Sequence, residues 1–184
     1  YPLAFSKGIR VVTNSGGLNP KAAGQKLAEA FAKMGLKGVK IAVLSGDDLL
    51  PRLPELKEAG LALANMDTGQ SFWDVNTPVT HANVYVGAAK VKEALDAGAN
   101  LILAGRVADP CLTLGILCHH YGWNLGPDGL TQEDWDKLAS GILVGHLLEC
   151  GGQASGGNSY LEWPPSYTMG NLAYPIAHVE SDGT

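Results

Sequence analysis

The feature that most constrains this sequence is the order of segments within its first 44 residues: an apolar run, a Gly-rich turn, an amphipathic stretch and a second apolar run. Residues 9–13 (IRVVT) are rich in β-branched side chains and predict a buried strand. Pro20 suits the first helical position and Asn19 the N-cap, and apolar residues keep helical spacing until Gly35. Residues 39–44 predict the second strand. A crossover through a helix joins strands that run parallel.

The same alternation continues along the rest of the chain. After residue 80 the sequence predicts a helix over 83–96, a strand over 101–104, and helices over about 110–121 and 132–149. The strand (LILA) is apolar throughout, as is typical of a strand covered on both faces. Residues 49–80 fit no regular element clearly. The predicted fold class is therefore α/β: an open, mostly parallel sheet with helices on both faces, in one domain over residues 1–184.

Composition narrows the class of protein. The net charge of −5 and the lack of a Lys/Arg run argue against a nucleic-acid partner, and no run of 18 apolar residues predicts a membrane span. The three cysteines show no CxxC spacing, which favours a reducing compartment such as the cytoplasm. Charged residues make up only 17% of the chain, which indicates either a large partner surface or missing sequence.

The ends of the sequence bear on that partner surface. The chain starts without Met, and Asp182-Gly183 reads as a hairpin turn with no returning strand. We therefore expect a piece of a longer polypeptide, acting as a homo-oligomer or packed against the rest of its own chain.

Polar, Gly-rich turns follow all three predicted strands, at residues 14–19, 45–48 and 105–109. Ligands of open parallel sheets bind beyond the carboxyl ends of the strands. The first turn, with Asn14, Gly16, Gly17 and Asn19, has two interpretations. It is either an anion site, in which amide groups and the helix dipole favour a phosphate or carboxylate, or an ordinary tight turn. It is neither GxGxxG nor a P-loop.

The second and third turns carry charged side chains. Asp47 and Asp48 could bind a metal, accept a ribose hydroxyl or act as a base; alternatively, one caps the next turn and the other is solvated. Arg106 is suited to a carboxylate or phosphate. Its alternative is a structural ion pair with Asp109, which precedes Pro110 and so could also cap the next helix.

A fourth Gly-rich segment follows the last predicted helix. His146 and Glu149 share one face of that helix, and Cys150 ends it. The negative end of the helix dipole raises a thiol pKa, which favours a packed Cys150 over a nucleophile. Backbone amides in such a run can form an anion nest. The candidate binding residues of this segment are Gln153, Ser155, Gly156, Gly157 and Asn158.

Together these patterns predict a set of site residues. The candidates for proton transfer are Asp47, Asp48, Asp109, His146 and Glu149. The candidates for binding a substrate or anion are Asn14, Gly16, Gly17, Asn19, Arg106, Gln153, Ser155, Gly156, Gly157 and Asn158. No metal site is predicted, and no nucleotide-cofactor fingerprint identifies a cofactor.

Five motifs in this order resemble the acyclic terpene utilisation family (AtuA-like proteins): VTNSGGLNPKA, GDDL, THANVYVGA, AGRVADPCLTLG and GHLLECGGQASGGN. The later PIAHVESDG resembles it too. The resemblance covers nearly the whole chain, and it implies that a full member is longer. It also implies a role in the catabolism of branched acyclic terpenes such as citronellol and geraniol, through CoA thioesters. The resemblance provides no set of catalytic residues. It also implies that position 111 varies in the family, which argues against Cys111 as a catalytic group.

The residues and the resemblance together lead to two expectations of function. The first is an enzyme that acts on a small carboxylate or acyl-CoA through a lyase, hydratase or isomerase step. The alternative is a non-catalytic accessory subunit of an acyl-CoA-processing assembly.

Overall fold

A three-stranded parallel sheet forms the centre of the fold in this computed structural model, which describes residues 1–158, 170 and 172–184. Its strands are β1 (Val11–Thr13), β2 (Ile41–Leu44) and β3 (Leu101–Ala104), in the order β1-β3-β2. Leu101 lies opposite both Val11 and Ile41, so the last strand inserts between the first two. The predicted parallel sheet is confirmed, and β1 and β2 each begin two residues later than expected.

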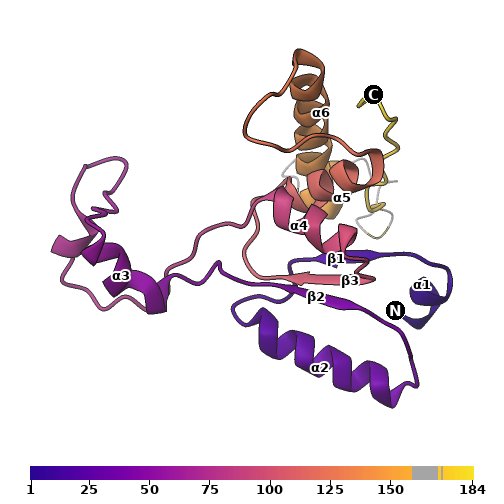
Figure 1. Ribbon diagram of the computed structural model, residues 1–184, viewed down its shortest axis with the longest axis horizontal. Coiled ribbons are helices and arrows are strands. Elements are labelled where there is room, and N and C mark those ends of the chain that lie inside the picture. Colours follow the sequence, from indigo (N-terminus) through magenta and orange to yellow (C-terminus); the bar gives the residue numbers. More distant parts are fainter. Residues whose placement is uncertain (159–169, 171) are drawn as a thin grey trace.

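Helices cover both faces of the sheet, as predicted (Figure 1). Helix α2 (Pro20–Lys33) lies on one face, and α4 (Ala88–Asp96) and α5 (Cys111–Tyr121) lie on the other. All four residues of β3 are buried, and Ile102 is fully inaccessible. Burial of each such aliphatic side chain contributes roughly 1.5–3 kcal/mol. The apolar character of LILA is thus explained by its central position.

Two glycines allow the helices to approach closely. A Cβ at Gly24 of α2 would lie 2.5 Å from a methyl group of Val43, and a Cβ at Gly115 of α5 would lie 2.5 Å from Cβ of Val91 in α4. Close approach of backbone is a common reason for glycine inside a helix. The two contacts hold α2 against β2 and α5 against α4.

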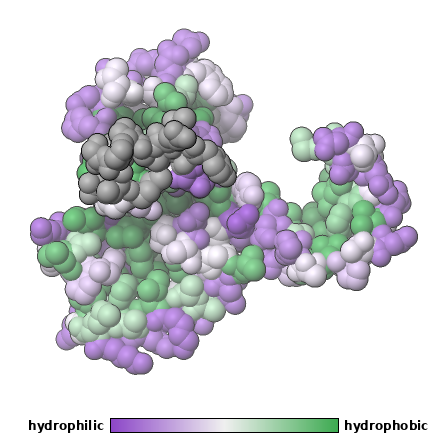
Figure 2. All heavy atoms as spheres, turned by 180° about the vertical axis from the view of Figure 1, so that it is seen from behind, coloured by the Kyte–Doolittle hydropathy of each residue, from purple (hydrophilic) through white to green (hydrophobic). Residues whose placement is uncertain are grey.

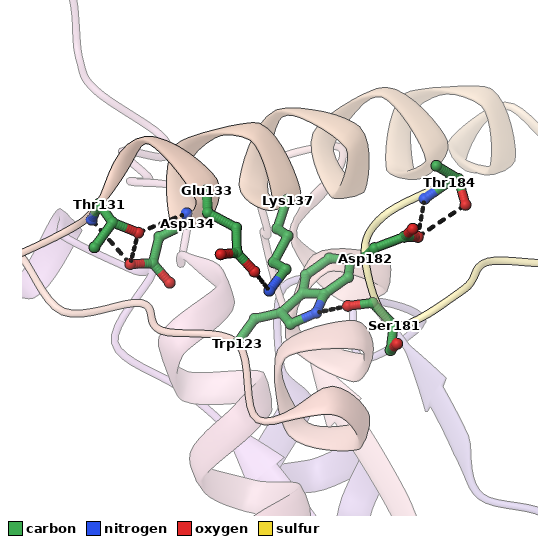
Figure 3. A network of polar contacts seen from close by, with 8 residues as sticks. All are labelled: Trp123, Thr131, Glu133, Asp134, Lys137, Ser181, Asp182 and Thr184. Carbon is green, nitrogen blue, oxygen red and sulfur yellow. Dashed lines mark hydrogen bonds and ion pairs between the residues drawn. The ribbon is translucent and has the colours of Figure 1, made fainter.

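Helix α6 (Gln132–Glu149) packs beyond α5 and begins with the predicted cap. Thr131 accepts a hydrogen bond from the backbone of Asp134, whose carboxylate accepts one from Thr131 N at 2.9 Å (Figure 3). The C-terminal segment lies against this region, where Trp123 donates from its indole nitrogen to the carbonyl of Ser181 at 2.9 Å. The chain end is therefore anchored to the α5–α6 layer.

Residues 49–82, here called the arm, project away from the sheet (Figures 1 and 2). They contain η1 (Leu50–Arg52), α3 (Leu53–Glu58) and η2 (Phe72–Asp74). At the base of the arm Leu49 N donates to Ala82 O at 2.8 Å. Several apolar side chains of the arm are exposed, and Met66 is 96% exposed. The described part of the chain also includes α1 (Pro2–Ser6) and η3 (Gly151–Ser155), and none of its helices is long and apolar enough to cross a membrane.

The helix predicted over 83–96 begins only at Ala88, so the first part of that prediction is wrong. Asn83 instead forms an antiparallel bridge with Asp48, and Val86 forms a parallel bridge with Val107. Gly87, in an extended conformation, separates this stretch from the helix. The valines that suggested a helix thus belong to an extended segment beside the turn that follows β3.

Candidate functional site

The three turns after the strands meet at one rim of the sheet, as the parallel topology requires. Gly16 N donates to Ala104 O at 3.0 Å, which joins the first turn to the end of β3. The backbone N of Arg106 donates to Asp47 Oδ2 at 2.9 Å, which joins the second turn to the third. The central turn is therefore in contact with both of its neighbours.

Asp47 forms the centre of this junction. Its side chain is only 3% exposed, although it carries a carboxylate. Besides the bond from Arg106 N, it receives a long contact of 3.5 Å from the amide of Asn83. A Cβ at Gly105 would lie 2.5 Å from the same oxygen, so only glycine leaves room for the carboxylate there. The alternative in which one aspartate caps a turn and the other is solvated is thus wrong in its second part, because Asp47 is buried and braces the turn after β3.

Asp48 behaves as the structural alternative predicts. Its side chain is exposed, and its carboxylate accepts a hydrogen bond from Leu50 N at 3.0 Å, which caps the start of the arm. A shallow pocket of about 410 Å³ lies beside it and is lined also by Asn19 and Lys21. Asn19 caps α2, since its side chain accepts from Ala22 N at 3.0 Å.

The Arg106 side chain extends toward solvent over an aromatic ring. Its guanidinium carbon lies 5.3 Å from the ring centroid of Tyr85, and its NH2 donates to the Tyr85 hydroxyl at 3.3 Å. Within the described part of the chain no carboxylate pairs with it, so the alternative of an Arg106–Asp109 ion pair is wrong. Nor does Asp109 cap α5, whose N-cap is Pro110 without a side-chain bond. The guanidinium retains donors for a ligand.

A pocket of about 150 Å³, here called the rim pocket, gathers the polar groups of these turns. Its lining consists of Asn14, Gly17, Tyr85, Gly105, Arg106, Val107, Asp109 and Glu149. It adjoins a second pocket of about 240 Å³ that shares Asn14, Asp109 and Glu149 and adds Thr113. One cation, two carboxylates and an amide side chain therefore face one space.

A larger pocket of about 620 Å³ lies on the other side of Arg106, at the base of the arm. Tyr85 lines it, together with Leu18, His81 and Val84. Tyr85 is not among the predicted site residues because the valine spacing places residues 83–96 in a helix. The signal that could identify it is Gly87, which ends the extended segment.

Glu149 also shapes the chemistry of Cys150. The thiol donates to Glu149 Oε2 at 2.8 Å. That hydrogen bond raises the pKa of Cys150, and partial loss of hydration and the negative charges of Glu149 and Asp109 raise it further. The direction of the pKa shift agrees with the prediction, although its main cause is Glu149 and not the helix dipole. The prediction of a packed thiol is wrong, because Cys150 is exposed. A thiol held in its neutral form is a poor nucleophile.

The amides of the first Gly-rich turn are mostly used within the protein. Those of Gly16, Gly17 and Asn19 donate to the carbonyls of Ala104, Asn14 and Gly16. A Cβ at Gly16 would lie 2.5 Å from Ala104 O, so this glycine serves close packing. These three amides do not form an anion site, and this turn reaches the rim pocket through Asn14 and Gly17.

The fourth Gly-rich segment is likewise satisfied internally. The amides of Gln153, Gly156 and Gly157 donate to carbonyls at positions 150, 153 and 152, so they form no anion nest. Of the described residues, those lining the rim pocket extend only to Glu149. The predicted binding roles of Ser155 and Asn158 stay predictions. His146 is exposed on α6 and lies outside that lining.

Comparison with known proteins gives one finding. A family model described as "Acyclic terpene utilisation family protein AtuA" matches residues 1–184. The search of curated proteins and the search of solved structures returned no match.

Proposed function

Because the chain belongs to the acyclic terpene utilisation family AtuA, we propose that it is an enzyme acting on a small carboxylate or an acyl-CoA thioester at the rim pocket. The proposed reaction is a lyase, hydratase or isomerase step, in which protons are moved on the carbon skeleton of the substrate. This proposal combines the family with the polar groups that face the pocket.

Arg106 supplies the observation that carries the proposal. Its guanidinium lines the rim pocket and the larger neighbouring pocket, and no described carboxylate pairs with it. An arginine fork binds carboxylate or phosphate through parallel charge-assisted hydrogen bonds, each worth about 1.5–3 kcal/mol. Contact with Tyr85 limits the positions that the side chain adopts, which lowers the entropic cost of binding.

Asp109 and Glu149 are the proposed proton carriers. Both line the rim pocket beside Arg106. One carboxylate would take the proton from the carbon next to the substrate carbonyl, and the second, in its acid form, would return a proton elsewhere on the substrate. The negative charge that develops on the carbonyl oxygen would be stabilised by the guanidinium.

Thermal unfolding with and without ligand tests this proposal. Butyryl-CoA and succinate are added separately to the wild-type chain, to Arg106→Gln and to the control Arg52→Gln, whose side chain pairs with Glu55 in the arm. We expect at least one probe to raise the Tm of wild type and Arg52→Gln but not of Arg106→Gln. Ligand at 100 times its Kd adds about 2.7 kcal/mol to stability. If neither probe changes any Tm, the proposal is wrong.

The arm supports the alternative, a non-catalytic accessory subunit. Leu61, Met66 and Val75 of the arm are each at least 47% exposed, and exposed apolar side chains gathered on a projecting segment favour contact with another protein. This alternative predicts no response to either probe. It also predicts that the wild-type chain elutes from size-exclusion chromatography as an oligomer, and that the double variant Met66→Ser/Val75→Ser elutes at a larger volume, as a single chain.

A further inference from the structure

A separate pocket, here called the Arg10 pocket, lies at the opposite end of the sheet, where the strands begin. It encloses about 470 Å³, within the range typical of small-molecule sites. Arg10, directly before β1, lines it together with the end of α5. The apolar part of the lining is Val12, Leu95 and Ile116, and the polar part is Arg10, His119 and His120.

The Arg10 side chain is held by a chain of polar contacts from two helices. Its guanidinium contacts Nε2 of His119. Nδ1 of His119 lies 2.6 Å from Asp96 Oδ1, and the other oxygen of Asp96 accepts from Lys92 at 2.7 Å. Both oxygens of Asp96 are therefore occupied, and the chain of contacts ends at the guanidinium in the pocket.

The partners determine how His119 is protonated. Arginine keeps its protons in proteins, so Nε2 of His119 must accept the bond from Arg10. The remaining proton then sits on Nδ1 and is donated to Asp96. Hydrogen bonds from Lys92 and His119 lower the pKa of Asp96, which is therefore ionised near neutral pH. The imidazole thus links Asp96 to Arg10 and orients the guanidinium.

We propose that this pocket binds the carboxylate or phosphate group of a small, partly apolar molecule through the guanidinium of Arg10. His119 accepts from one side of the Arg10 guanidinium, which has five N–H donors. The remaining N–H groups are suited to an oxyanion. Unlike the rim pocket, which contains Asp109 and Glu149, the described lining here holds no acidic side chain. The local charge is thus positive in a chain whose net charge is −5.

The apolar wall indicates the kind of molecule. Val12, Leu95 and Ile116 lie in the same pocket as the guanidinium, so an oxyanion bound to Arg10 would bring any attached hydrocarbon against them. Burial of each CH₂ contributes about 0.8 kcal/mol. We therefore expect butyrate to bind more tightly than acetate if the ligand class is a carboxylate, and inorganic phosphate to bind if it is a phosphate.

Imidazole ¹H–¹⁵N correlation spectra at pH 7.5 test the proposal. The wild-type chain is titrated separately with acetate, butyrate and inorganic phosphate, and the ring signals of His119 are assigned from their loss in His119→Gln. We expect His119 in the Nδ1–H tautomer, and a saturable shift of its signals with phosphate or with butyrate ahead of acetate. Arg10→Gln should weaken binding at least tenfold, whereas Arg106→Gln and the surface control Lys7→Gln should leave it unchanged.

The controls separate this pocket from the rim pocket. If the saturable shift of the His119 signals is lost in Arg106→Gln but kept in Arg10→Gln, the probe binds in the rim pocket and the proposal is overturned. An Nε2–H tautomer of His119, or signals that none of the three probes moves, would also overturn it. If Arg10→Gln does not fold, Arg10→Lys takes its place: it keeps the charge but loses the fork, and should bind the probe several-fold more weakly. Equal affinity of Arg10→Lys and wild type would contradict a role for the fork.

Discussion

Replacing Gly105 by Ala should destabilise the fold through a collision with the side chain of Asp47. The added Cβ would lie 2.5 Å from Oδ2 and 2.9 Å from Cγ of Asp47, so the buried carboxylate must move and lose its bond from Arg106 N. The φ angle of Gly105 is not in the left-handed region, so alanine brings no backbone strain. Loss of a hydrogen bond to a charged group and overpacking together predict a cost of about 2–3 kcal/mol.

The double variant distinguishes this mechanism from ordinary crowding. Asp47→Ala alone should cost about 1.5–3 kcal/mol, because Arg106 N loses its charged acceptor. In the combined variant no carboxylate remains to collide with the new Cβ. Its cost should therefore match that of Asp47→Ala alone, so the coupling between the two positions should equal the whole cost of Gly105→Ala, about 2–3 kcal/mol.

Urea unfolding followed by circular dichroism measures all four states of this cycle. Gly152→Ala is the control, because a Cβ there would meet no atom of the described residues within 4 Å; it should change the free energy of unfolding by less than about 0.5 kcal/mol. Additive costs within error would refute the reasoning, since they would mean that the methyl group at position 105 does not act on Asp47.

Three further changes test other parts of the fold. Thr131→Ala removes the cap of α6 and should cost about 0.5–2 kcal/mol in urea unfolding. Burial raises the pKa of Cys118 from 9.0 to about 11; the unfolded chain therefore ionises first, and about 2–3 kcal/mol of stability, complete below pH 9, should be lost as the pH rises to 11. This loss should be absent from the pH profile of Cys118→Ala. Gly145→Ala places a Cβ 2.6 Å from the backbone of Pro110 and should lower the Tm by an amount equivalent to about 1–3 kcal/mol.

The elements of the fold could be predicted from local patterns, but their arrangement could not. The caps by Asn19 and Thr131 and the uniformly apolar strand at 101–104 are local signals, and the structure confirms each. Strand order depends instead on pairing between distant residues. Strands of three and four residues carry too little sequence to specify that β3 separates β1 from β2. The arm has no regular period, because most of it lies outside helices and strands.

The candidate site could be predicted in its position but only partly in its chemistry. Parallel strands bring the turns to one rim, so Asn14, Arg106 and Asp109 share a pocket. Composition does not distinguish a glycine that frees an amide for a ligand from one that permits close packing. Gly16 is of the second kind, because its amide and its missing Cβ both serve the contact with Ala104. That difference depends on a residue almost ninety positions away.

Asp47 connects the fold to the proposed chemistry. A carboxylate buried to this degree is costly unless hydrogen bonds replace its water, and its main donor is the backbone amide of Arg106. Its own carbonyl accepts from Val84 N at 2.8 Å, and Val86 N donates to Arg106 O at 2.9 Å. The end of β2, the turn after β3 and the base of the arm are thus one hydrogen-bonded unit. A ligand held by the Arg106 side chain would therefore bind to that unit rather than to a free loop.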